Sequence, residues 1–206
     1  MLSRNFLAEF RAATEGKWSE QSINPTISGF QFQRGTRWNP GLSDDKIAEY
    51  ETVLGVRFPH DFRAFLGAMN GTDLPTLNVY ASCGEPPRES VGVYSYPKDL
   101  RIVQLRIEDV RESRDEIATD LSEQGFVLPP EAALVPIYLH RYVVCTSDLN
   151  LSVVLSIVVH GTDAIVYGHS FSKRSGRLDS APLRENQPSG ADYGALFSWN
   201  NVAWVL

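Results

Sequence analysis

Residues 42–71 read LSDDKIAEYETVLGVRFPHDFRAFLGAMNG, and this stretch predicts two short amphipathic helices joined by a tight break. Ser43 is placed to cap the first helix, and Asp44 and Asp45 follow where the positive end of the helix dipole favours carboxylates. The apolar residues of this helix are spaced to share one face, and they are Ile47, Tyr50 and Leu54.

The second helix is defined by its ends and by a similar apolar spacing. Gly55 can adopt the left-handed conformation that ends a helix, and Pro59 suits the first turn of the next one, where no amide hydrogen is needed. Asn70 and Gly71 are predicted to close this second helix. Its apolar positions are Phe62, Phe65, Leu66 and Met69. A helical hairpin of this kind must lay its apolar faces on another element.

The hairpin pattern, Leu-Gly-x-x-Phe-Pro-x-Asp-Phe-x-x-Phe-Leu with a final Asn-Gly, resembles the SMI1/KNR4 superfamily, also called SUKH. The positions that carry the resemblance are Leu54, Gly55, Pro59, Asp61, Phe62, Phe65, Leu66, Asn70 and Gly71. Residues 30–41 are similar to the lead-in of some members, and a weaker agreement continues to about Phe171.

What the resemblance implies is an α+β fold and a role in protein binding. Many bacterial members look like immunity proteins that neutralise secreted toxins, often nucleases, and fungal members regulate cell-wall synthesis. The resemblance implies no catalytic residues. Every matched position is apolar, a cap or a turn former, so the fold carries over and a binding site does not.

The rest of the chain predicts helices packed on one side of a mainly antiparallel β-sheet. Residues 1–40 are expected to form an N-terminal helix and an irregular arm, and residues 41–206 the α+β domain. In the first helix the inward residues are Leu2, Phe6, Leu7 and Phe10. From Gly16 to Pro40 isolated aromatic residues are expected to pin an irregular segment.

Strands are predicted where β-branched and aromatic residues cluster. The predicted strands are 76–81, 91–94, 100–103, 134–139 and 142–145, and a hairpin at 153–167 that turns at 160–163 is expected to form the sheet centre. The prolines of segment 83–88 predict a loop there. A further loop is expected at 173–177, and a final element at 192–206.

Segment 107–123 predicts one acidic amphipathic helix. Its apolar side is formed by Ile107, Val110, Ile117 and Leu121. Its other side carries the candidate partner-binding residues, which are Glu108, Asp109, Glu112, Asp115, Glu116, Asp120 and Glu123. Between Glu108 and Glu131 eight acids face two arginines, a local charge of −6 that equals the total for the chain.

The acidic helix has two interpretations. An outer face of this composition is often only solvated. It can also be a docking surface for a basic protein, such as a nuclease toxin whose phosphate-binding groove is rich in Lys and Arg. The net charge of −6 argues against nucleic acid as the partner, because binding to phosphates needs clustered Lys and Arg.

The cysteines and the apolar segments indicate a cytoplasmic protein. Cys83 and Cys145 lie far apart, which favours reduced thiols over a disulfide. The opening segment is interrupted by Arg4 and Glu9, which the apolar core of a signal peptide would exclude. The longest apolar run, 151–159, is far shorter than the roughly 20 residues of a membrane span.

Catalytic and cofactor motifs are not found in the sequence. The histidines and cysteines form no HExxH, His-x-His or CxxC pattern that would hold a metal. Cys145 follows His140 closely but neither lies in a motif of a cysteine hydrolase. No glycine-rich phosphate loop is present. We therefore expect a non-catalytic chain without a cofactor.

The expected function is that of a cytoplasmic immunity protein that binds a toxin domain and inhibits it. One alternative is a regulator or adaptor of the same fold. Another is an enzyme whose site is assembled from scattered residues. The sequence leaves the partner and the oligomeric state open.

Overall fold

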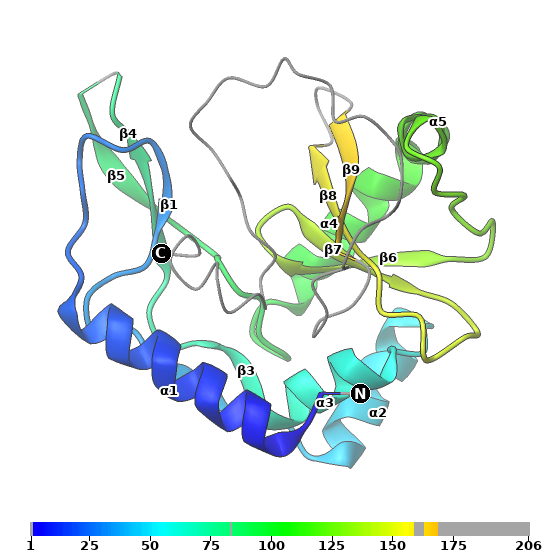
Figure 1. The fold of residues 1–206 in the computed structure, drawn as a ribbon, viewed down its shortest axis with the longest axis horizontal. Helices are drawn as coiled ribbons and strands as arrows, with labels where there is room; N and C mark the ends of the chain where they lie inside the picture. The colour runs from blue at the N-terminus through cyan, green and yellow to red at the C-terminus, as the bar shows by residue number, and fades with distance from the viewer. Residues whose placement is uncertain (1, 83, 159–162, 169–206) are drawn as a thin grey trace.

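A computed structural model of the chain describes residues 2–82, 84–158 and 163–168 (Figure 1). The helices in these residues are α1 (Arg4–Glu20), α2 (Asp44–Leu54), α3 (His60–Ala68), α4 (Leu100–Glu112) and α5 (Arg114–Glu123). The strands are β1 (Gly29–Gln31), β2 (Trp38–Pro40), β3 (Met69–Thr72), β4 (Thr76–Tyr80), β5 (Glu85–Ser90), β6 (Ala133–Tyr138), β7 (Arg141–Cys145), β8 (Val154–Val158) and β9 (Asp163–Gly168). The features predicted at 160–162, 173–177 and 192–206 lie outside the described residues.

The strands form antiparallel sheets, which together with the helices confirm the predicted α+β fold. The largest sheet has the order β6-β7-β8-β9, and smaller ones have the orders β1-β4-β5 and β2-β3. In Figure 1, α1, α3 and α2 run along the bottom, with the three-stranded sheet above α1 and the four-stranded sheet above α2 and α3. The predicted hairpin is present as β8 and β9, but the sheet centre is formed by β7 and β8.

The four-stranded sheet packs against helices on both faces, not on one face as expected. Alternate residues of a strand point to opposite sides. Val135 and Val143 belong to the hydrophobic cluster that includes residues of α1, α2 and α3. Leu134 and Val144 pack instead in the cluster that contains Ile117 of α5. Since both faces are apolar, the strands are almost continuously buried.

The N-terminal region is more regular than the sequence indicated, because α1 continues to Glu20 and strands β1 and β2 follow it. Trp18 is fully buried and stacks on Phe32 at 4.4 Å between ring centroids. The indole nitrogen of Trp38 donates to the hydroxyl of Thr14 at 2.7 Å. The three aromatic residues share one hydrophobic cluster with α2 and α3. A boundary between residues 1–40 and the rest stays a prediction.

The helical hairpin α2–α3 has the predicted helix signals. The hydroxyl of Ser43 accepts from the backbone N–H of Lys46, and Gly55 ends α2 with φ +67°. The end of the second helix differs, because α3 stops at Ala68 and the next residues form β3, paired with β2. Gly71 lies in this strand at φ +71°, where an added Cβ would be 2.5 Å from the Cβ of Ser95. The glycine of the Asn-Gly pair therefore allows the backbone to approach Ser95 closely, and the pair does not end a helix.

One strand prediction and one loop prediction are wrong, and a second strand prediction gives only a bridge. Residues 100–103 begin α4, since Leu100, Val103 and Ile107 follow the helical period and pack inward. In segment 83–88 the predicted loop includes the start of β5, an exposed edge strand. It tolerates Pro86 and Pro87 because its outer side needs no ladder partner and its register with β4 shifts between Glu85 and Arg88. Residues 91–94 contribute an isolated bridge to Tyr138.

Candidate protein-binding surface

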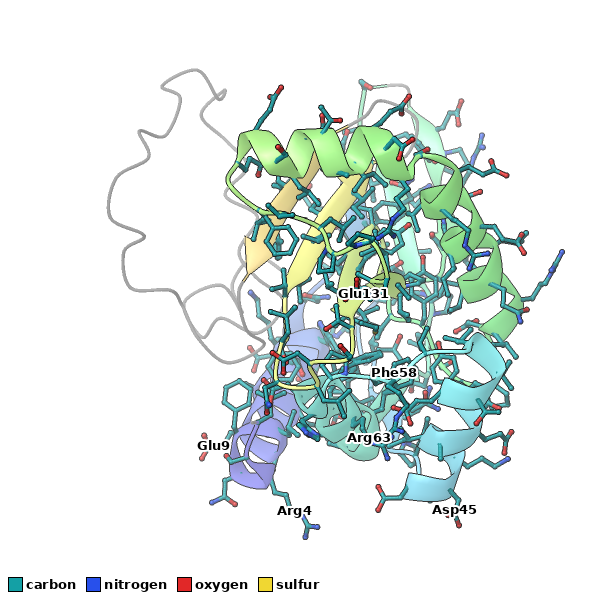
Figure 2. All side chains as sticks on the ribbon, turned by 90° about the vertical axis from the view of Figure 1, so that its right-hand side faces the viewer. Arg4, Glu9, Asp45, Phe58, Arg63 and Glu131 are labelled. Atoms are coloured by element: carbon teal, nitrogen blue, oxygen red, sulfur yellow. The ribbon has the colours of Figure 1, made fainter. Side chains whose placement is uncertain are left out.

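The predicted acidic helix is two helices, because the chain turns at Ser113 between α4 and α5. Ser113 has φ −94° and ψ 15°, outside the geometry of a continuing helix. Figure 2 shows α5 running across the top of the molecule while α4 descends beside it. The seven candidate acids therefore lie on two helices. Glu112 is at the end of α4, and Asp115 is in the first turn of α5.

Five of the seven acids are exposed and have no ionic or hydrogen-bond partner for their carboxylates in the part of the chain that the structure describes. They are Glu108, Glu112, Asp115, Glu116 and Glu123. Exposed carboxylates without an internal partner keep their hydration, so they are available to a basic ligand.

The other two acids are used inside the molecule. Asp109 pairs with Arg106 at 3.7 Å on the same helix. The Oδ2 atom of Asp120 accepts the backbone N–H of Ala164 in β9 at 3.2 Å. Asp120 is therefore a structural residue, and its place in the predicted binding set is not supported by its contacts.

The negative charge is concentrated on α5. In α4 three acids are balanced by Arg101, Arg106 and Arg111, whereas α5 has four acids and Arg114 alone, which leaves −3. The guanidinium of Arg114 donates to the carbonyls of Pro129 and Ala132, at 2.6 and 2.8 Å. Arg114 thus holds the loop before β6 and turns away from the exposed acids.

Two exposed apolar residues lie on α4, and the sequence analysis missed both. Leu105 is 41% exposed and Ile102 is 38% exposed, and the spacing of three residues places them next to each other on the helix. Ile102 was hidden by the wrong strand prediction for 100–103. A helical period read from Leu100 onward would have placed both opposite the inward face of Leu100, Val103 and Ile107.

A second candidate feature is an open depression of about 500 Å³ between α2 and the start of α3. Small residues of α2 and its C-cap shape one side, and they are Ala48, Thr52 and Gly55. Charged side chains line the rest, and they are Glu51, Arg57 and Arg63. No sequence motif marks this site, because its residues come from two helices and the loop between them.

Glu51 is the buried centre of this depression, with its side chain 6% exposed. Its Oε1 accepts the backbone N–H of Phe58 at 2.7 Å, and its Oε2 pairs with the guanidinium of Arg63. The Nε of Arg57 lies 3.9 Å from Oε1, beyond a hydrogen bond. Glu51 therefore holds the α2–α3 loop in place. The ionic contact between Arg57 and Glu51 is long and weak.

A buried cation lies on the face of the four-stranded sheet that also carries Val143 and Cys145. Arg141 is 6% exposed, donates to the hydroxyl of Ser156 at 2.7 Å and stacks on the ring of Tyr167. Burial, reinforced by the positive charge of Arg141, lowers the pKa of His140 to about 4. Burial raises the pKa of the Tyr138 hydroxyl above its ordinary value. At neutral pH His140 and Tyr138 are both uncharged, and Arg141 carries the charge.

Cys145 packs as a small apolar residue. Cys145 is buried at the end of β7 in the main hydrophobic cluster. Burial, followed by the charge of Glu51, raises the pKa of its thiol well above the ordinary value. A thiol in this environment stays protonated and is a poor nucleophile.

The described ranges contain neither a metal-binding cluster nor a membrane-spanning helix. No group of three His, Cys, Asp or Glu residues is placed there to hold a metal ion. Among the same residues no helix is both long and apolar enough to cross a membrane.

Comparison with known proteins identifies the family. The comparison with curated proteins gave no match, and that with solved structures gave none either. The family model described as SMI1 / KNR4 family (SUKH-1) matches residues 41–149, which is more than half of the chain. The matched range begins just before α2–α3 and extends through both acidic helices to β7. The chain therefore belongs to the SMI1 / KNR4 family (SUKH-1).

Proposed function

We propose that this chain is a non-catalytic protein-binding domain that acts as an immunity protein and neutralises a bacterial toxin by direct complex formation. The observation that carries the proposal is the group of five exposed, unpaired carboxylates on α4 and α5. We place the toxin on this surface and assign it a basic character, as in a nuclease domain with a phosphate-binding groove.

The acidic surface supports inhibition by simple occupation. A groove built to bind phosphates offers Lys and Arg side chains at regular intervals, and carboxylates on a rigid helix can neutralise them in place of the nucleic acid. Opposite charge on the two surfaces also accelerates association, which matters for an inhibitor that must bind before the toxin acts. Such an inhibitor needs neither turnover nor a cofactor.

The environments of Cys145 and His140 support a binding role. The thiol of Cys145 is buried and protonated, and His140 is a separate neutral group held beside Arg141. We propose the cytoplasm as the compartment, because an immunity protein must meet a toxin that acts on intracellular nucleic acid.

A second candidate function is that of a regulator or adaptor of the same fold. It is favoured by Leu105 and Ile102, which are exposed on a helix whose own charges balance. An apolar pair of this kind fits a partner that is not strongly basic. A toxin gene beside this gene favours immunity, whereas an isolated gene favours regulation.

The experiment that tests the proposal is recovery of the tagged chain from its native host, followed by identification of proteins bound in stoichiometric amount. We expect one basic protein, whose expression alone stops growth and whose co-expression with this chain restores it. Recovery of a neutral or acidic partner whose expression leaves growth unchanged would contradict the immunity role.

A further inference from the structure

The depression between α2 and α3 contains an exposed arginine that makes only one long ionic contact in the described residues, with Glu51. The carboxylate of Glu51 already has one close partner on each oxygen, the backbone N–H of Phe58 and the guanidinium of Arg63. Arg57 stands 3.9 Å from the same carboxylate, and its side chain is 71% exposed. In residues 2–82, 84–158 and 163–168 it has no hydrogen-bond acceptor.

The charge of the depression is unbalanced by one unit. Arg57 and Arg63 together carry +2, and Glu51 carries −1, so a single negative charge would neutralise the site. A guanidinium presents parallel N–H donors that match the two oxygens of a carboxylate. Ala48, Thr52 and Gly55 leave the open volume of about 500 Å³ into which such a group can enter.

We propose that this depression is a carboxylate-binding site, in which Arg57 grips an Asp or Glu side chain of the protein partner. Arg57 supplies the paired donors, and Arg63 adds positive charge while it remains bound to Glu51. A carboxylate fits the single excess charge better than a phosphate dianion does. That the carboxylate comes from a protein partner rests on the proposed function. That the depression binds a carboxylate does not depend on it.

The site and the acidic helices lie on the same side of the molecule. In Figure 1, α5 is at the upper right and α2 at the lower right, and Figure 2 looks onto that side, with Arg63 below Glu131 and α5 above both. One partner can therefore meet both features. It would present Lys and Arg to α5 and one carboxylate to the depression, and this alternation of charge would fix its orientation.

The test uses acetate as the probe and requires no partner. In the full chain, the Nε–Hε resonances of Arg57 and Arg63 are followed by NMR during titration with sodium acetate, with sodium chloride as the salt control. The variant Arg57→Gln removes the charge of an exposed side chain and should fold normally. Arg4→Gln, at an exposed arginine on α1, is the matched control.

We expect saturable acetate shifts at Arg57 and Arg63, an affinity at least tenfold weaker in Arg57→Gln, and no change in Arg4→Gln. Shifts that grow linearly at all arginines, or an Arg57→Gln variant that titrates like the original chain, would overturn the proposal. Inorganic phosphate that binds more tightly than acetate would overturn the assignment to a carboxylate. These results are independent of whether the acidic helices bind a toxin, so the two proposals fail separately.

Discussion

The carboxylate of Asp120 in α5 accepts the backbone N–H of Ala164 in β9, at 3.2 Å. Gln124, just after α5, completes this contact, since its amide donates to the Ala164 carbonyl at 2.7 Å and accepts from Val166 N–H at 3.3 Å. These backbone groups lie on the side of β9 away from β8. Side chains of α5 thus occupy hydrogen-bonding groups that an edge strand would otherwise expose.

The first prediction concerns this edge contact. Gln124→Ala removes two hydrogen bonds to β9 and should lower the free energy of unfolding by about 1 kcal/mol. Urea denaturation followed by circular dichroism measures the change. Glu116→Ala, at an outward position of the same helix, should stay within about 0.5 kcal/mol of the original chain. Equal effects of the two substitutions would show that the edge contact contributes nothing.

The second prediction concerns the buried carboxylate of Glu51. Glu51→Ala leaves the guanidinium of Arg63 and the N–H of Phe58 without their acceptor, which should cost about 3 kcal/mol of stability. Arg57→Gln should cost less than about 0.5 kcal/mol, because Arg57 is exposed and makes no short contact with Glu51. Denaturant unfolding of both variants provides the comparison. A Glu51→Ala variant as stable as the original would contradict the role of Glu51 in holding the loop.

The third prediction is a pH dependence from His140. Its pKa is about 4 in the folded chain, below the ordinary value of 6.5, so the unfolded chain binds the extra proton between these values. Stability from this residue is therefore complete above pH 6.5 and is lost as the pH falls toward 4. The loss should be about 1–2 kcal/mol, because solvent screens a half-buried group.

The control for this pH effect is His140→Asn, which cannot titrate. Unfolding free energies of the two proteins at pH 7, 6 and 5 should differ progressively, with the smaller decline in the variant. Parallel curves would mean that His140 has the same pKa in the folded and unfolded chains.

The fourth prediction concerns the reactivity of Cys145. In a Cys83→Ser variant the remaining thiol should react with a disulfide reagent far more slowly in the native protein than in denaturant, because it is buried and protonated. Absorbance of the released thiolate measures the rate. Rapid stoichiometric reaction of the native variant would indicate an accessible thiolate and reopen a catalytic role for Cys145.

The parts of the fold that could be predicted from the sequence depend on local signals. Ser43 and Gly55 mark the ends of α2 by their own chemistry, so α2 was located correctly and the family followed from it. Strands β4, β6 and β7 were recognised from their β-branched residues for the same reason.

The parts that could not be predicted depend on tertiary context. Leu100 to Val103 contains β-branched residues that also suit a helix, and only packing of Val103 in the core decides between the two. The break at Ser113 carries no glycine or proline. For the candidate surface, the helical period predicts that the acids face outward. It does not reveal that Asp120 accepts the backbone N–H of Ala164 in β9, because the two residues are 44 positions apart.

In the proposed complex the partner binds through the carboxylates where α4 meets α5. Calorimetry measures the affinity for the isolated partner over a range of salt concentrations. The test variant is Glu112→Lys/Glu116→Lys. The control is Glu9→Lys/Glu20→Lys, which changes the net charge by the same amount on α1. We predict that the first pair weakens binding by about tenfold or more and flattens its salt dependence, and that the second pair has a small effect. Equal losses in both variants, or no loss in the first, would contradict the claim.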